Sequence, residues 1–247
     1  EGAKIIYDFT WNDFCDWYIE IAKTRFYGSD PELAQTARIV AVHVLQGILK
    51  LLHPYAPFIT EELWHHFRGE DNTDLIVAQW PELQSKLINK NIEADMKLLQ
   101  EVITAVRTIR SRMNVPPAKR ADLVVRGSES ALNKIRQHVG VIKSLARLEN
   151  VNSGTDLAKP AHSATAVVGN MELFIPLAGL IDLELERTRL EKRFSELNGH
   201  LAGVQKKLVN QNFIDRAPEQ VVARERQKVV DFNSELEKIK FNLEMLA

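Results

Sequence analysis

The chain has 247 residues, 45% of them hydrophobic and 26% charged, which are the proportions of a globular protein. Its 32 Lys and Arg against 33 Asp and Glu give a formal net charge of −1, which excludes a strongly basic, histone-like protein. No apolar run approaches the roughly 20 residues of a membrane-spanning helix, and residues 1–18 resemble neither a signal nor a transit peptide. The single cysteine, Cys15, excludes an internal disulfide and a cysteine-based zinc cluster. We therefore expect a soluble, cytoplasmic protein.

Residues 1–117 are predicted to form a helical bundle. Asp30 followed by Pro31 has the pattern of a helix N-cap with proline in the first turn, and apolar residues then recur at three- and four-residue steps. The prolines of the sequence HPYAPF end that helix, because proline has no N–H to donate. Thr60 is then placed to cap a short helix over residues 61–67.

The end of this region is expected to be less regular. A loop through Gly69 and Asn72 leads to a predicted extended segment over residues 75–81. A last helix is predicted over residues 92–113, where the apolar side chains share one face, and two prolines end it.

Residues 118–178 change to a mixed pattern that predicts a small β-α-β-β subdomain. A helix is expected over residues 128–146, and the pair Gly169-Asn170 is a two-residue hairpin signal. Strands are predicted over residues 121–127, 147–152 and on both sides of that pair within 164–177.

Residues 179–247 carry two heptad runs and predict an antiparallel coiled-coil hairpin, so that the whole fold class is mainly α. A helix of about 30 residues makes an arm on the order of 45 Å long. The first seam consists of Leu183, Arg187, Leu190, Phe194, Leu197, Leu201, Val204 and Leu208. The second consists of Val222, Glu225, Val229, Phe232, Leu236, Ile239, Leu243 and Leu246. In an antiparallel register, Glu225 is expected to meet Lys206 or Lys207 near the tip, and Arg187 to meet Glu244 near the root.

The neutral total charge hides a basic distal half of this arm. Residues 187–228 hold ten Lys and Arg against five acids, a local net charge of +5, on an acidic root. Such an arm suits phosphate binding, because each cation placed on a phosphate releases a condensed counterion. The alternative is an ordinary solvated coiled-coil surface. The candidate RNA-binding residues of the arm are Lys192, Arg193, Lys206, Lys207, Arg224, Arg226 and Lys228.

A second basic stretch covers residues 107–126. Arg107 and Arg110 share one helical face there and are further candidates for RNA binding. Salt bridges to neighbouring helices would explain the same residues equally well.

Signatures of catalysis and of metal binding are weak in this sequence. It contains no Gly-x-Gly-x-x-Gly, P-loop or Gly-x-Ser-x-Gly pattern, so no catalytic residue is assigned. A single Glu-x-x-His step, Glu62 and His65, falls short of a di-iron site, which needs two such steps and two further carboxylates. His65 and His66 are expected at the surface and no metal ligand is assigned. His43 and His53 are expected in the core, as is most of the aromatic group Tyr7, Phe9, Trp11, Phe14, Trp17 and Tyr18, with Cys15 packed beside it as a small hydrophobe.

Two stretches of sequence resemble a known family. WNDFCDWYIEIAK, followed by LLHPYAPFITEELW, resembles the anticodon-binding helical bundle of class I aminoacyl-tRNA synthetases of the valine, isoleucine and leucine group. MELFIPLAGLID, the heptad runs and KLVNQNFIDRAPEQVVARERQK resemble the C-terminal end of bacterial valyl-tRNA synthetases. An isoleucyl enzyme would be expected to end in a cysteine zinc knuckle, for which one cysteine does not suffice.

The resemblance implies that the parent protein uses ATP with Mg²⁺ to attach valine to tRNA-Val. The His-x-Gly-His and Lys-Met-Ser-Lys-Ser motifs that hold ATP in the family are absent from this sequence. The chain is therefore expected to be a C-terminal portion without catalytic or editing domains, to bind no cofactor itself, to be monomeric and to work with the rest of the synthetase in cis. The bundle would meet the anticodon region and the arm the outer corner of the tRNA. Further contacts are expected from Lys23, Arg25 and Arg38 of the bundle.

Two other classes of function stay open from the residues alone. A structural coiled-coil adaptor would show concentration-dependent oligomerisation and no salt-sensitive RNA binding. A helical metalloenzyme would hold stoichiometric iron or manganese.

Overall fold

The computed structural model describes residues 1–68 and 73–246, so the loop predicted through Gly69 and Asn72 lies outside the described residues. The chain separates into two compact units, Glu1–Ala94 and Asp95–Ala247. It is mainly α-helical with one small sheet, as predicted, while the three-part division at residues 117 and 178 stays a prediction. Among the described helices, none is both long enough and apolar enough to cross a bilayer.

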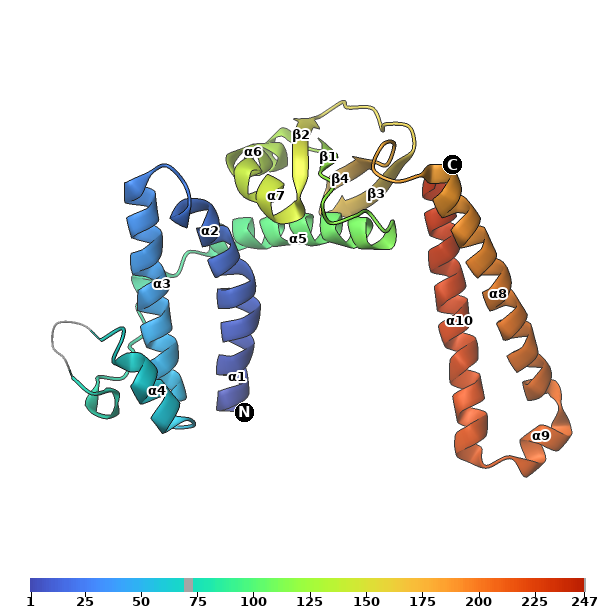
Figure 1. The fold of residues 1–247 in the computed structure, drawn as a ribbon, viewed down its shortest axis with the longest axis horizontal. Helices are drawn as coiled ribbons and strands as arrows, with labels where there is room; N and C mark the ends of the chain where they lie inside the picture. The colour runs from blue at the N-terminus through green and yellow to red at the C-terminus, as the bar shows by residue number, and fades with distance from the viewer. Residues whose placement is uncertain (69–72, 247) are drawn as a thin grey trace. The chain divides into compact units, whose positions relative to one another are not determined.

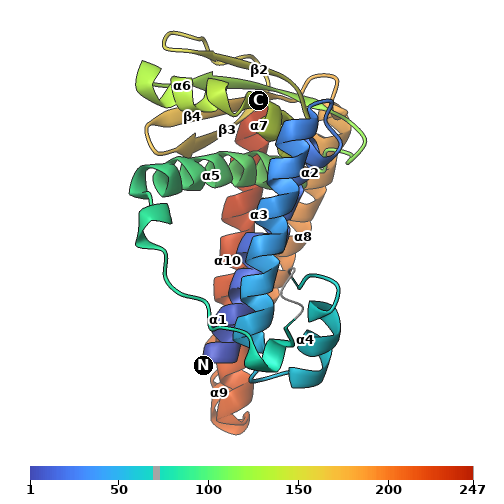
Figure 2. The same ribbon diagram turned by 90° about the vertical axis from the view of Figure 1, so that its left-hand side faces the viewer.

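The first unit is built on two long helical segments that lie side by side. α1 (Gly2–Asp8), the π-helical segment η1 (Phe9–Ile19) and α2 (Glu20–Phe26) follow one another without a break, and α3 (Pro31–Leu52) returns alongside them (Figures 1 and 2). Asp30 caps α3, because its carboxylate accepts hydrogen bonds from the Glu32 and Leu33 amides at 2.9 and 3.1 Å. This cap and the proline after it confirm the start predicted for α3.

The segment after α3 differs from the prediction at both of its ends. α4 (Pro57–Trp64) begins at Pro57, so Thr60 is not its cap but lies within it and donates to the Ala56 carbonyl at 2.8 Å. The predicted extended segment is instead a 3₁₀ turn, η2 (Leu75–Val77), followed by another, η3 (Ser85–Leu87). The physical reason is packing: Leu75 is buried against Leu49 and Trp64, which draws this part of the chain onto the ends of α3 and α4.

The N-terminal aromatic group is less buried than predicted. Phe14 is buried and stacks on Tyr18 at 5.8 Å between ring centroids, whereas Tyr7, Phe9 and Trp11 are exposed. α3 covers one face of this helical segment, and the exposed rings lie outside that face. His43 is also exposed, contrary to the prediction, while the half-buried His53 lies 2.9 Å from the Thr60 hydroxyl through Nδ1.

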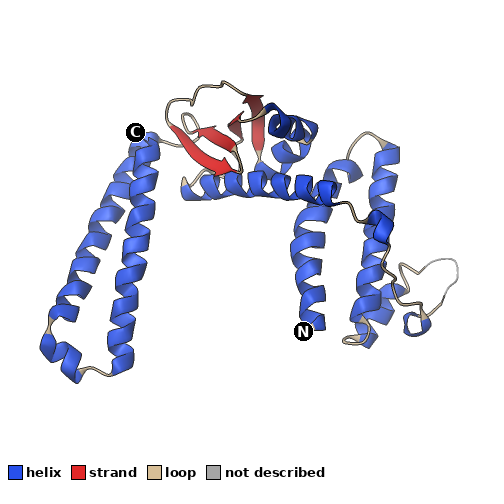
Figure 3. Ribbon diagram, turned by 180° about the vertical axis from the view of Figure 1, so that it is seen from behind, coloured by secondary structure: helices blue, strands red, loops and turns tan. Residues whose placement is uncertain are grey.

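The second unit is organised around a sheet, drawn in red in Figure 3. Its four strands have the order β2-β1-β4-β3. Its strands are β1 (Ala121–Arg126), β2 (Leu148–Gly154), β3 (Ser163–Val168) and β4 (Met171–Pro176). β1 and β2 are parallel, and β4 pairs antiparallel with both β1 and β3. Gly169, at a φ of +56°, turns β3 into β4 as the hairpin signal predicted.

Helices accompany this sheet. α5 (Lys90–Arg112) matches the predicted helix and buries an apolar face from Leu99 onward. The single helix predicted between β1 and β2 is two helices, α6 (Glu129–Gln137) and α7 (Val139–Ala146). The break lies at His138, whose φ of −112° and ψ of 16° leave the helical region. The change of direction there allows both halves to contact β2 and to bury their own apolar side chains.

The arm consists of two antiparallel helices, α8 (Leu183–Val209) and α10 (Glu219–Leu246), that run side by side (Figure 1). Twenty-seven residues make α8 about 40 Å long. The predicted loop between them contains a short helix, α9 (Gln211–Arg216). In the first seam Glu186 is buried and Arg187 is exposed, the reverse of the prediction. Arg189 and Asn114 bind the Glu186 carboxylate at 2.6 and 3.2 Å, which compensates for its burial at the root of the arm.

Candidate nucleic-acid interface

Four of the predicted arm cations are exposed and have no ion-pair or hydrogen-bond partner within the described part of the chain. They are Lys192 and Lys206 on α8 and Arg224 and Arg226 on α10. The helices are held together by a different set of side chains, the buried apolar seam. These four charges therefore face solvent and are available to phosphate groups.

The other three arm cations take part in ion pairs. Lys207 Nζ lies 3.9 Å from Glu225 Oε2, and Lys228 Nζ donates to Glu225 Oε1 at 2.6 Å. Arg193 pairs with Glu235 across the two helices at 3.0 Å. Their charges are partly neutralised within the arm, so they contribute less to an RNA surface than the four free cations.

The contacts of Glu225 confirm half of the predicted register. Glu225 meets Lys207 near the tip, as expected for the antiparallel pairing. The hydrogen bond from Lys228 holds the pKa of Glu225 below its ordinary value, and the charges of Lys207 and Lys228 act in the same direction against the opposing effect of burial. The predicted partner of Arg187 was wrong: Arg187 pairs at 3.5 Å with Glu191 of its own helix, not with Glu244.

The tip of the arm also carries a groove that the sequence did not predict. It has a volume of about 550 Å³ and lies between α9 and the first turns of α10. Ile214, Val222 and Val230 form apolar parts of its wall and Arg226 lines it as well. The groove depends on α9, and the residues of α9 were expected to form a loop.

Two of the three candidates in the first unit are exposed without a described hydrogen bond or ion pair. They are Arg25, at the end of α2, and Arg38, on α3. Lys23 pairs with Glu20 one turn earlier in the same helix. An exposed pair of this kind is weak, so Lys23 stays accessible to an anion.

Arg110 is a correction to the prediction, because its side chain is buried rather than free to reach a ligand in solvent. Its guanidinium donates to the carbonyl oxygens of Lys119 at 2.7 Å and of Pro116 and Arg147 at 3.3 Å. Arg107 is exposed on the same helix, and its Nε donates to the Leu145 carbonyl at 3.0 Å. Carbonyl oxygens, rather than the carboxylates considered as an alternative, are the partners of Arg110.

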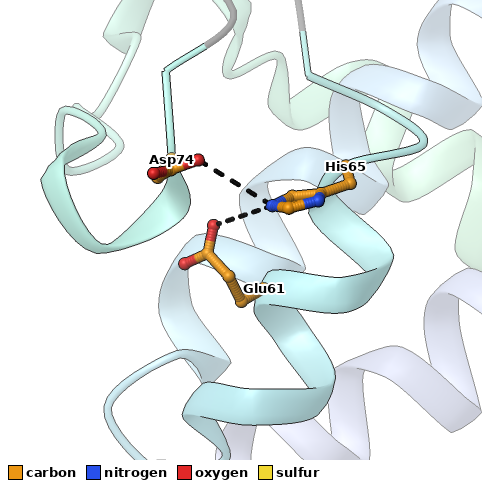
Figure 4. A group of neighbouring side chains, drawn as sticks. All are labelled: Glu61, His65 and Asp74. Carbon is orange, nitrogen blue, oxygen red and sulfur yellow. Dashed lines mark ion pairs between the residues drawn. The ribbon is translucent and has the colours of Figure 1, made fainter.

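The Glu-x-x-His step does not form the pair that the sequence suggested. Glu61, rather than Glu62, lies near His65, and Asp74 joins them within 4.8 Å (Figure 4). Glu61 accepts hydrogen bonds from the Leu75 and Ile76 amides at 2.7 and 3.2 Å, and His65 Nε2 is 3.7 Å from Glu61 and 3.8 Å from Asp74. These contacts explain the cluster as the attachment of η2 to α4. His65 and His66 are exposed, as predicted.

Two stretches of the chain match known protein families, and the class of protein follows from the first match. Residues 1–125 match the anticodon-binding domain of tRNA ligase, and the chain belongs to this family. Residues 182–247 match the valyl tRNA synthetase tRNA binding arm. Both matches confirm the resemblance found in the sequence motifs.

The curated relatives with the most similar sequences include several valine–tRNA ligases. A valine–tRNA ligase of Listeria innocua is 41% identical over 233 residues, which cover 94% of this chain and 26% of the relative. Valine–tRNA ligases of Syntrophotalea carbinolica and Bacillus subtilis are 39% and 38% identical and cover 100% and 94% of the chain. The chain spans about a quarter of the length of these relatives.

Proposed function

We propose that this chain is the tRNA-binding part of a valine–tRNA ligase and that its specific partner is tRNA-Val. The observation that carries the proposal is the arm, in which Lys192, Lys206, Arg224 and Arg226 are exposed and unpaired within the described residues. A chain of nearly neutral net charge that concentrates exposed cations on one hairpin is suited to the phosphates of a folded RNA.

The two parts of the chain have different tasks in this proposal. RNA helices are bound mostly through shape, phosphates and 2′-hydroxyls, and single-stranded loops through stacking and base edges. The arm, about 40 Å long, fits the first task at the outer corner of the tRNA. The first unit fits the second task at the anticodon region, because Arg25 and Arg38 are exposed there together with aromatic rings such as Trp11.

The groove at the arm tip extends this assignment. Its apolar wall fits the flat face of an unstacked base, and Arg226 in the same groove fits the neighbouring phosphate. In the whole enzyme, ATP with Mg²⁺ would activate valine in the part of the protein outside this chain. We infer that the chain acts in the cytoplasm, as part of a monomer and without a catalytic residue or cofactor of its own.

The test is a titration of the chain with tRNA-Val and with a non-cognate tRNA at two salt concentrations. The variant Lys206→Glu/Arg224→Glu/Arg226→Glu should weaken binding strongly at low salt. It should also reduce the slope of log K against log salt by about 0.7–0.9 for each phosphate that no longer meets a cation. Helix content, measured by circular dichroism, should stay that of the parent because these side chains are exposed.

Lys238→Glu is the matched control, because Lys238 is an exposed lysine on the root half of α10. It should change binding far less than a single change at Arg224 or Arg226. Unaltered tRNA binding by the triple variant, together with oligomerisation that rises with concentration, would favour the coiled-coil adaptor instead.

A further inference from the structure

A groove in the second unit concentrates positive charge outside the arm. It has a volume of about 480 Å³ and lies between the C-terminal end of α5, the segment that follows it and the end of α7. Three arginines, Arg107, Arg110 and Arg147, line it together with Ser111. None of its described lining residues is acidic. A concave surface with three guanidinium groups and no carboxylate favours an anionic ligand.

Arg110 forms the buried wall of this groove. Its side chain is 7% exposed, and its described partners are the three carbonyl oxygens of Arg147, Pro116 and Lys119. Burial lowers the pKa of Arg110, and the neighbouring charge of Arg147 lowers it further. Carbonyl dipoles satisfy the N–H groups but do not neutralise the charge, and a buried cation without a carboxylate is normally unfavourable.

Arg147 is an exposed lining residue of the groove and has an unusual backbone conformation. It caps α7 with a φ of +53°, a left-handed conformation that glycine and asparagine adopt more readily than arginine. Its Nη1 donates to the Pro117 carbonyl at 2.7 Å, which holds the exposed side chain over the segment after α5. Against that one hydrogen bond stand an unfavourable backbone conformation and the repulsion between Arg147 and Arg110. An anion bound by Arg147, with the buried charge of Arg110 behind it, would explain the presence of arginine at this position.

We propose that this groove binds one phosphate group, with Arg147 and Arg107 at its opening and the charge of Arg110 behind them. Arginine suits this task, because its planar guanidinium donates two parallel hydrogen bonds to phosphate oxygens. The phosphate is either a phosphodiester of a bound RNA or a free phosphate ion. The RNA source rests on the proposed function and adds a tRNA contact to those of the bundle and of the arm. Binding of a free phosphate ion does not depend on the proposed function.

Arg147→Asn is the variant that separates binding from folding. Asparagine keeps the left-handed cap and removes both the charge and the Nη1 hydrogen bond to Pro117, so the variant should fold with the same helix content and a Tm close to that of the parent. Arg112→Asn is the matched control, because Arg112 is an exposed arginine at the end of α5 that does not line the groove.

The first measurement is the Tm of the full chain in increasing inorganic phosphate at constant ionic strength. A bound ligand should raise Tm with its concentration. Phosphate also stabilises folded proteins in general, so the readout is the difference between variants. The Tm of the parent and of Arg112→Asn should show the larger, saturating rise. The Tm of Arg147→Asn should rise only by the general stabilising effect of phosphate. Equal rises in all three proteins would overturn the proposal.

The second measurement is the salt dependence of tRNA binding by the same three proteins. If the phosphate belongs to RNA, Arg147→Asn should reduce the salt slope by about 0.7–0.9 and Arg112→Asn should not. An abolished phosphate response with an unchanged tRNA slope assigns the groove to the free ion. The arm variant distinguishes the two proposals: if it weakens tRNA binding while Arg147→Asn does not, the proposed function stands and the RNA source for this groove fails.

Discussion

At the scale of single residues, Glu225 shows how a charged side chain is accommodated in an apolar seam. It is buried between the two arm helices, where Lys228 and Lys207 face its two carboxylate oxygens at 2.6 and 3.9 Å. Breaking a buried pair costs more than forming it contributes, because the remaining charge is left without its partner. The role of such a residue is to select one register of the two helices.

The lowered pKa of Glu225 gives a prediction of pH dependence. A carboxyl whose folded pKa lies below its ordinary value of 4.5 adds stability above that pH, and the stability is lost as the pH falls through the folded pKa. We expect Glu225→Gln to lower the Tm of the arm at pH 7, and the difference from the parent to shrink below pH 4. Melts followed by circular dichroism at both pH values check this. Glu237→Gln, at an exposed position of α10 with no described partner, should show no such convergence.

Arg110 and Arg147 show, again at the residue scale, that basic residues close together in the sequence need not form one exposed basic surface. Arg107 and Arg110 are three residues apart and were assigned the same role, yet one is exposed and the other is buried beneath three carbonyl oxygens. Arg147 lies 37 residues further on, outside that stretch, and completes the groove.

At the scale of elements, the arm is the part that depends most simply on its sequence. The heptad seam alone buries α8 against α10 for much of their length, with Leu197 only 1% exposed and Leu236 6%. Leucine is suited to these positions because it fills the holes between two facing helices. An element held by one narrow seam should melt when that seam is opened.

Truncating the seam tests this directly. Leu197→Ala or Leu236→Ala should cost roughly 2–5 kcal/mol of stability in the arm, which is the cost of removing a buried leucine side chain and leaving a cavity. Circular dichroism should then show a lower-temperature transition for the arm, ahead of the remaining helices. Val230→Ala, on the exposed side of α10, is the control and should leave the melt almost unchanged. Melts of the leucine variants that coincide with that of the parent would contradict the seam.

At the scale of the whole molecule, we expect this chain to bind RNA and another part of the enzyme to activate valine. The sequence has neither of the ATP-holding motifs expected from the family, and the chain covers only 26–28% of its relatives. We expect the purified chain to show no valine-dependent exchange of pyrophosphate into ATP while it still binds tRNA. A standard exchange assay, with a full-length valine–tRNA ligase as positive control, checks this. Exchange activity that copurifies with the chain would contradict the assignment.

Much of the fold was predictable because the signals are local. The Asp30-Pro31 cap, the Gly169-Asn170 hairpin and the heptad seams each depend on a few neighbouring residues, and the structure confirms all three. The family resemblance, from short motifs at both ends of the chain, was confirmed as well. By contrast, two of the errors in the predicted elements lie where packing decides the structure: η2 follows the burial of Leu75, and the break at His138 follows the packing of two helices on β2.

The sequence by itself determined which residues carry charge and which helices pair, because charge and heptad spacing depend only on the residue types and their positions in the chain. It could not determine which of those charges are free. Lys207 and Lys228 share the single carboxylate of Glu225, Arg110 is buried under carbonyl groups, and Lys206, Arg224 and Arg226 stay exposed. Only the tertiary structure decided this, because the availability of a charge depends on its partners and its burial, and both follow from how the chain folds and packs rather than from sequence spacing alone.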